Sequence, residues 1–358
     1  MASSCTVQAA LPSRRRHGPS YAPPVPLEHL HVLDLLELTG SQPKAARALA
    51  MHQSTVCRSA ALMGQQFRLQ PGRGASVCRY GSNESLRQLR LAYRAHRLMG
   101  GQLRIATDPL HQPLLAGMLS VQAVPPRIRP SQEWAQLLSQ ALIDGAIVSS
   151  WCHPLVLAVE RLPSWSGVIT VPLGTLPLQL VSHLPTTAEA TTPRKVLLPR
   201  RHVTPLLHEA LAWHGFQVEQ QPISCQDVPS CLKRMQDRQL AMPLCPGLVD
   251  PGWFQTQSLV AHSEQPQLSE QLWLLLPQGL VGSSREARHL IRTLRQRVEK
   301  AGEARIGEGD LTQEEKDPAE GGTREASPAG ISSKNHAVGA SLPRHEHGER
   351  TASAAVPL

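Results

Sequence analysis

Within Ser41–Ala60, SQPKAARALAMHQSTVCRSA, an amide, two hydroxyls and a guanidinium occur within six residues. They belong to Gln53, Ser54, Thr55 and Arg58. Glutamine can bind the edge of adenine, arginine binds guanine or phosphate, and serine or threonine can contact either. If this segment is helical, Val56 points to the opposite side and anchors the helix to a core. The pattern therefore predicts a helix that can enter the major groove of DNA.

Three short helices are expected to position these side chains. The first is indicated by apolar residues at helical spacing, namely Leu30, Leu33, Leu36 and Leu38. A second helix should extend over about 43–50, with Ser41 as its N-cap, and a third over about 52–63. The small pair Ala45 and Ala46 lets the helices approach closely, and Leu49 follows on the same face.

The same region is strongly basic. From Leu38 to Met99 there are ten lysine and arginine residues and one acidic residue, Glu84. Such an imbalance should attract the phosphate backbone, with an affinity that falls as salt is added. The alternative is an ordinary helical bundle with a solvated, arginine-rich surface. Four basic side chains are predicted to hold the DNA backbone: Lys44, Arg47, Arg73 and Arg79.

Two further features follow the predicted third helix. The segment QPGRGASVCRYGS, rich in glycine and arginine, suits a short loop or wing. The segment NESLRQLRLAYRAHRLM then predicts a fourth helix. Its residues Leu86, Leu89, Tyr93 and His96 recur at 3-4-3 spacing, which predicts a short seam able to pair two chains.

From residue 101 onward, predicted strands alternate with predicted helices. The strands are expected at 103–107, 146–149, 168–171, 178–182, 195–198, 217–220, 240–244 and 271–276. The helices are expected at 110–120, 131–142, 203–214, 226–237 and 283–300. This alternation predicts α/β units with largely parallel sheets, and the segment is long enough for two small lobes.

The N-terminal motif resembles the winged helix-turn-helix of LysR-type transcriptional regulators. The matching positions are Gly40-Ser41, Ala45-Ala46, Leu49, Gln53, Ser54-Thr55, Val56 and Cys57-Arg58. The basic segment RGASVCRYG is similar to the family's wing. Beyond it, GQLRIATDP, LAMPLCPGLV and QLWLLLPQGLVGSSREARHLIRTLRQRV resemble parts of the family's effector domain. Gln42, Cys57 and Gly64 depart from the family pattern.

The resemblance implies a domain organisation. It comprises a winged helix-turn-helix at 27–81, a linker helix at 82–100 and a two-lobe effector domain at 101–300 that is similar to periplasmic binding proteins. Lobe I would cover about 101–190 plus 268–300, and lobe II about 191–267. The arm 1–26 and the tail 301–358 have compositions typical of disorder.

The resemblance also implies a small-molecule effector between the lobes, double-stranded DNA as a partner, and a homodimer or homotetramer. In α/β sheets a ligand lies at strand ends and helix N-termini, where backbone N–H groups favour an anion. Thr107, Ser131 and Thr204 are the preferred effector contacts, although each could be a helix cap without a ligand. Asp108 would disfavour a carboxylate there. The alternative function is a two-lobe binding or sensory protein that has lost specific DNA binding.

Composition limits the other possibilities. The net charge of +8 favours an acidic partner, and seven cysteines without a CxxC spacing argue against a disulfide framework or a zinc site. No phosphate loop, GxSxG or HExxH motif is present. We therefore expect that the protein is not an enzyme and binds no cofactor or metal. Cys245 is expected to be a packed thiol. With no apolar run of spanning length, the protein is expected to be cytoplasmic.

Overall fold

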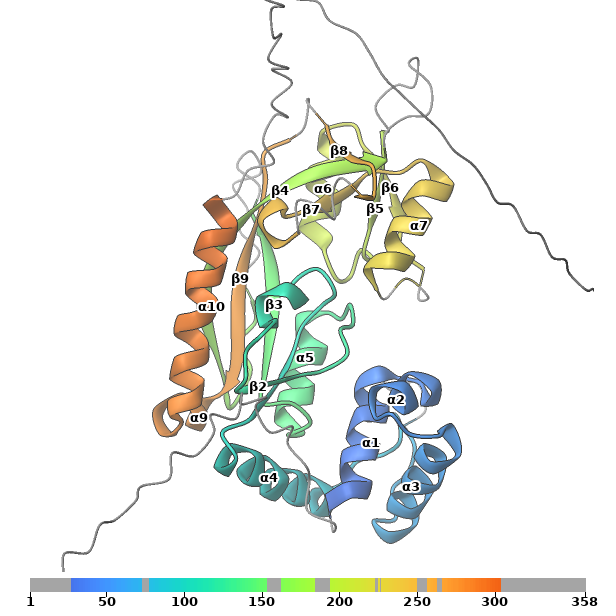
Figure 1. Ribbon diagram of the computed structural model, residues 1–358, viewed down its shortest axis with the longest axis vertical. Helices are drawn as coiled ribbons and strands as arrows, with labels where there is room; N and C mark the ends of the chain where they lie inside the picture. Colours follow the sequence, from blue (N-terminus) through green and yellow to red (C-terminus); the bar gives the residue numbers. More distant parts are fainter. Residues whose placement is uncertain are drawn as a thin grey trace, which may run out of the picture. The chain divides into compact units, whose positions relative to one another are not determined.

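In the computed structural model the first three helices form a small bundle (Figure 1). They are α1 (Glu28–Thr39), α2 (Gln42–Ala48) and α3 (Gln53–Gln66). The helix α1 ends at Gly40, whose φ of 70° suits glycine, and Ser41 caps α2 by accepting a hydrogen bond from the Lys44 N–H at 3.4 Å. The three predicted helices are confirmed, because the caps that delimit them are local features of the sequence.

The structure describes residues 27–72, 77–152, 162–183, 194–222, 225, 227–249, 256–262 and 266–303. All of them belong to the first of two units into which the chain divides, Met1–Gly309. The predicted arm and all but the first residues of the predicted tail lie outside the described residues, as do residues 73–76 of the predicted wing.

The helix α1 is buried on two sides. Val32 and Leu36 pack with Ala45, Ala46 and Val56 of the next two helices. Leu35 and Leu38 instead pack into an apolar cluster of the α/β region that includes Ala106, Trp134 and Leu137. The helical bundle is therefore attached to the α/β region through its first helix.

The helix α4 (Glu84–Met99) begins after Asn83, whose side chain accepts a hydrogen bond from the Leu86 N–H at 2.9 Å. Leu86 and Tyr93 are fully buried and pack against Leu30 and Leu33 of α1. The predicted pairing seam on this helix is therefore wrong, since two of its four side chains are used inside the chain's own core.

The larger sheet has the order β2-β1-β3-β9-β4-β7, and β8 also pairs with β4. Its strands are β1 (Leu103–Ala106), β2 (Val121–Ala123), β3 (Gly145–Cys152), β4 (Val168–His183), β7 (Met242–Leu244), β8 (Leu259–Ala261) and β9 (Leu268–Pro277). A second sheet consists of β5 (Lys195–Leu198) and β6 (Gln217–Gln220), paired in parallel.

Helices cover these strands. They are α5 (Ser131–Ser139), α6 (Pro205–Trp213), α7 (Val228–Arg238), α9 (Gln278–Ser283) and α10 (Arg285–Glu303), with 3₁₀ turns at Gln112–Leu115 and Pro246–Leu248. The helix α10 lies along β4 and β9 and buries Leu290, Leu294 and Val298 (Figure 1). That spacing of four residues places all of them on one face of the helix.

The prediction of largely parallel sheets is wrong. In the described chain β1 pairs in parallel with β2 and β3, but β9 is antiparallel to β3 and β4, and β4 is antiparallel to β7 and β8. The strands expected at 168–171 and 178–182 are one strand, because the irregularity between Pro172 and Gly174 shifts the register without ending the pairing with β9.

The helix expected at 110–120 is reduced to one 3₁₀ turn, after which Gly117 takes a positive φ of 70°. The three-residue strands β2 and β8 are too short to give a period in the sequence.

Candidate functional site

The outer face of α3 carries most of the predicted base-contacting residues. Gln53, Ser54 and Arg58 are exposed, and Thr55 is partly buried. The opposite face buries Val56 and Met63 against the other helices of the bundle. The helix thus has the apolar back and polar front that the sequence predicts.

Local hydrogen bonds fix the start of this face. Gln53 Nε2 donates to Gln42 Oε1 at 3.2 Å, and His52 Nδ1 lies 2.8 Å from the Ser54 hydroxyl. Arg58 Nε donates to the Ser54 carbonyl at 3.4 Å. Gln42, at a position that departs from the resembled pattern, therefore orients one of the residues predicted to contact bases.

Of the four basic residues predicted to contact phosphate, three are described by the structure and are exposed. Lys44 and Arg47 are exposed on α2, and Arg79 is exposed before α4. Arg73 lies outside the described residues. The loop at Arg79 is held by Glu37, whose carboxylate accepts hydrogen bonds from the backbone N–H groups of Arg79 at 2.9 Å and Tyr80 at 2.6 Å. Burial raises the pKa of Glu37, and these hydrogen bonds oppose that shift.

Not every basic residue of this region can meet phosphate. Arg90 and Arg97, counted in the sequence as part of a DNA-attracting stretch, are fully buried. The reason is that each forms an ion pair with an aspartate outside that stretch, Asp34 for Arg90 and Asp144 for Arg97, both at 2.8 Å. The local imbalance of charge is therefore smaller than the sequence indicates.

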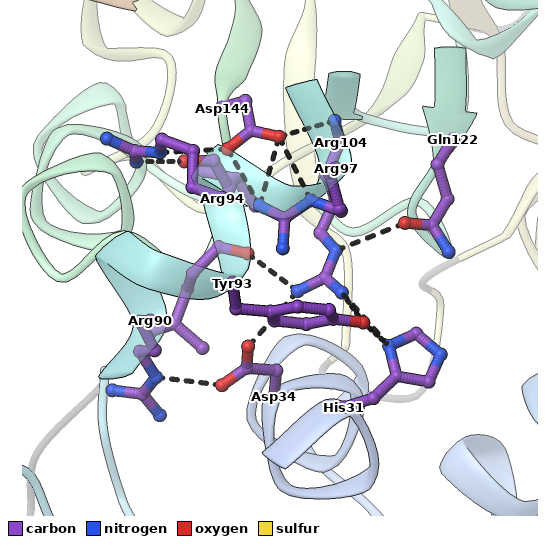
Figure 2. A network of polar contacts seen from close by, with 11 residues as sticks. His31, Asp34, Arg90, Tyr93, Arg94, Arg97, Arg104, Gln122 and Asp144 are labelled. Carbon is purple, nitrogen blue, oxygen red and sulfur yellow. Dashed lines mark hydrogen bonds and ion pairs between the residues drawn. The ribbon is translucent and has the colours of Figure 1, made fainter. Parts of the chain in front are cut away.

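These ion pairs belong to a buried arginine network that joins α1, α4 and the first strands (Figure 2). Asp34 binds Arg90 and also Arg104 of β1, at 3.2 Å. Asp144 accepts hydrogen bonds from Arg97, from Arg94 at 2.9 Å and from the Arg104 N–H at 2.8 Å. We define the network as His31, Asp34, Arg90, Tyr93, Arg94, Arg97, Arg104 and Asp144.

An aromatic pair completes the network. The Tyr93 hydroxyl lies 2.8 Å from His31 Nδ1, which is 3.0 Å from Arg104 Nη2 (Figure 2). The Arg97 guanidinium lies over the Tyr93 ring, 4.6 Å from its centroid, as a cation–π contact. Burial, together with the Arg104 charge, lowers the pKa of His31 to about 4, so this imidazole is neutral at pH 7.

The network contains more positive than negative charge. Its four arginines face two aspartates, so two positive charges are uncompensated within it. Arg90 Nη1 and Nη2 and Arg97 Nη1 are buried without a hydrogen-bond partner among the described residues. Buried hydrogen-bond donors without a partner lower the free energy of unfolding. The network therefore connects α1, α4 and β1 but also carries a cost in stability.

A cavity of about 260 Å³ lies between residues of the first strands and residues of the β5–β7 region. Ser131, the first residue of α5, and Thr204, which precedes α6, both line it. Thr107 does not line it. Its side chain is buried, and its hydroxyl has no hydrogen-bond partner among the described residues. Two of the three predicted effector contacts are thus brought together.

An acidic cluster at one side of the cavity was missed by the sequence analysis. His111 is buried between two carboxylates, with Nδ1 2.7 Å from Asp108 and Nε2 2.7 Å from Glu270. These carboxylates raise the pKa of His111 well above its usual value despite burial, and the imidazolium lowers the pKa of Asp108. Asp108 and His111 are three residues apart, so two of the three members of this cluster are neighbours in the sequence, whereas Glu270 is distant.

One arginine connects the cavity with the helical bundle. Arg129 lines the cavity and forms an ion pair with Glu133 at 3.0 Å. Its Nη2 donates to the carbonyl oxygens of Glu37 at 3.4 Å and Leu38 at 3.2 Å, at the end of α1. Arg129 therefore contacts both the cavity and the end of α1.

The described residues do not favour a nucleophilic cysteine or a metal site. Burial raises the pKa of Cys245 to about 11, so its thiol stays protonated at pH 7 and is a poor nucleophile. Within the described ranges, no group of three histidine, cysteine, aspartate or glutamate side chains could hold a metal ion. No helix there is long and apolar enough to cross a membrane.

No protein-family model and no curated protein sequence matches the chain. Among solved structures, the chain is similar to CbnR, a LysR family transcriptional regulator, at 11% identity and a TM-score of 0.43, covering 78% of this chain and 99% of that one. It is similar to ArgP from Mycobacterium tuberculosis at 17% identity and a TM-score of 0.41, covering 75% and 96%. It is also similar to full-length LysG from Corynebacterium glutamicum, with bound effector Arg, at 14% identity and a TM-score of 0.37, covering 76% and 98%.

Proposed function

We propose that this chain is a DNA-binding transcriptional regulator of the LysR type, with residues 27–81 as its winged helix-turn-helix. One observation carries the proposal: α3 presents Gln53, Ser54 and Arg58 outward while its apolar face is buried in the bundle. An exposed helix with amide, hydroxyl and guanidinium groups suits base edges in the major groove.

The basic residues around α3 take a second role in this proposal. Lys44 and Arg47 on α2 and Arg79 beyond α3 contact phosphates, together with Arg73. Thr55, which is partly buried, contributes its hydroxyl at the edge of the same face. Phosphate contacts fix the position of the protein on DNA, whereas the base contacts supply the sequence preference.

In this proposal the cavity binds a small-molecule effector, with Ser131 and Thr204 among its contacts. The effector changes DNA binding by favouring one of two arrangements of the helical bundle. Two connections support that coupling: Arg129, which joins the cavity wall to the end of α1, and the arginine network, which joins α1 to α4 and β1. No catalytic step is part of this function.

Two or four copies of the chain are proposed to act together in the cytoplasm, beside the DNA that they bind. Helix-turn-helix proteins usually occupy paired half-sites, and the symmetry of the DNA site then mirrors that of the protein. Because α4 buries Leu86 and Tyr93 within one chain, the pairing surface has to use other residues. Sedimentation equilibrium should give the mass of a dimer or tetramer.

The test is binding of the full chain to the DNA upstream of its own gene, measured by fluorescence anisotropy over a series of salt concentrations. We expect Arg58→Ala to weaken specific binding about tenfold or more, since one good base contact contributes about 1–3 kcal/mol. Arg292→Ala, which removes an exposed arginine from α10, is the matched control and should bind as the wild type does.

A steep fall of affinity with salt, together with discrimination against unrelated DNA, would support the regulator. Weak binding that ignores both the DNA sequence and the Arg58 substitution would contradict it. That result would favour the alternative, a two-lobe binding or sensory protein without specific DNA binding.

A further inference from the structure

The acidic cluster includes Glu270, a residue that lines the cavity and has one carboxylate oxygen without a hydrogen bond from the described chain. Glu270 is buried, and only its Oε1 is bonded, to His111 at 2.7 Å. Among the described residues no hydrogen bond reaches its Oε2. Asp108 is the more exposed of the two carboxylates, and its oxygens already accept from His111 and from the Leu110 N–H at 2.8 Å.

The charges of the cluster do not cancel. Asp108 and Glu270 contribute two negative charges and His111 at most one positive charge, so the cluster keeps a net negative charge. Among the described residues that line the cavity, the other cation is Arg129, and its charge is already paired with Glu133. A buried negative charge is unfavourable unless a positive group approaches it.

Two further side chains at the cavity each have an oxygen atom without a partner among the described residues. Gln221 and Thr204 are buried, and neither Gln221 Oε1 nor the Thr204 hydroxyl has a hydrogen-bond partner among the described residues. The Gln221 amide nitrogen donates to Cys231 Sγ at 3.4 Å, which leaves its oxygen as the unused group. Gln221 Oε1 and Glu270 Oε2 can each accept a hydrogen bond that the described residues do not supply, so a ligand that donates hydrogen bonds suits the site.

The rest of the cavity is apolar. Its walls include Trp134, Trp151, Leu207 and Met242, so the body of a ligand is expected to be hydrophobic. A volume of about 260 Å³ favours a small molecule.

We propose that this cavity binds a small molecule that carries a protonated amine on an apolar skeleton, with the amine at Glu270. The inference rests on the proposed function, because it names the class of effector for the same site. It differs from the anion expected from the sequence. Helix N-termini carry about half a positive charge each, so α5 and α6 can take a hydroxyl or carboxylate of the same ligand but supply no cation for Glu270.

The test is isothermal titration calorimetry on the full chain at pH 7 with three probes of similar size. They are 2-phenylethylamine, L-phenylalanine and 3-phenylpropionate, which carry an amine, an amine with a carboxylate, and a carboxylate alone. We expect at least one amine probe to bind and 3-phenylpropionate not to bind. Binding of both amine probes indicates a simple amine, and binding of L-phenylalanine alone indicates an amino acid.

Glu270→Gln keeps the shape of the side chain and removes its charge, and we expect it to weaken the amine probe at least tenfold. Glu299→Gln, on the exposed face of α10, is the control and should leave binding unchanged. Thr204→Val provides a second variant if Glu270→Gln does not fold, as judged by circular dichroism. It should also weaken the amine probe.

The inference is overturned if neither amine probe binds, if only 3-phenylpropionate binds, or if a variant that folds binds the amine as tightly as the wild type. The anisotropy assay without ligand separates this failure from that of the proposed function. A chain that binds DNA specifically but no amine remains a regulator with another class of effector.

Discussion

Removing Asp34 should destabilise the protein far more than removing its partner Arg90. Asp34 is fully buried and lies 2.8 Å from Arg90 Nε and 3.2 Å from Arg104 Nη1. Asp34→Asn takes one of two negative charges from a network of four arginines, so the uncompensated positive charge rises from two to three. Breaking a buried ion pair in this direction costs about 3–5 kcal/mol, a large part of a typical domain's stability.

Arg90→Met changes the same contact in the opposite sense. It removes one of the uncompensated charges together with two guanidinium nitrogens that have no partner among the described residues. Asp34 keeps its ion pair with Arg104. The remaining cost is the lost hydrogen bond, about 1 kcal/mol, offset by the apolar methionine in a buried position.

Urea unfolding of both variants, followed by circular dichroism at pH 7, measures the difference. We expect Asp34→Asn to lower the free energy of unfolding by at least about 2 kcal/mol more than Arg90→Met does. The double variant should be more stable than the sum of the single effects predicts, because Arg90 no longer lies beside a lost charge. Equal costs, or a larger cost for Arg90→Met, would refute the reasoning that excess positive charge dominates this network.

Two other predictions concern pH and coupling. Stability should be greatest near pH 6.5, the usual pKa of histidine: below it the unfolded chain gains a proton that His31, with a pKa lowered to about 4, does not bind in the folded chain. Above pH 6.5 folded His111, with its raised pKa, keeps a proton that the unfolded chain loses. Urea titrations at a series of pH values should therefore show the free energy of unfolding falling on both sides of pH 6.5. His31→Gln should flatten only the acidic side of this profile. The Arg129→Met variant should still bind the effector alone and DNA alone. It should lose most of the coupling free energy between the two ligands, which is typically about 1–3 kcal/mol, as measured by anisotropy titrations of DNA with and without the effector. An unchanged coupling free energy would show that Arg129 does not carry the coupling.

The parts of the fold that the sequence predicts are those with local signals. Ser41 caps α2, and the bounds of β5 and β6 match the expected ones because each is a short strand next to a clear helix. The antiparallel pairing of β4 with β9 could not be predicted, since it depends on a distant segment of the chain. Pro172 also looks like the end of a strand, although the structure continues through it.

The site follows the same division. The face of α3 is a local pattern, and the structure exposes it as expected. The burial of Arg90 and Arg97 was missed because their aspartates lie 56 and 47 residues away in the sequence. Charged side chains are rarely buried unless paired, so without those partners the sequence favours a solvated surface.

The strand β4 has a consequence for how the α/β region unfolds. Its first part pairs with β9 and its last residues pair with β7 and β8, so one continuous strand joins β7 and β8 to the rest of the larger sheet. A fragment that omits β4 would leave β7 and β8 without the strand they pair with. We therefore expect the two predicted lobes to unfold together, so that heating this region gives one cooperative transition.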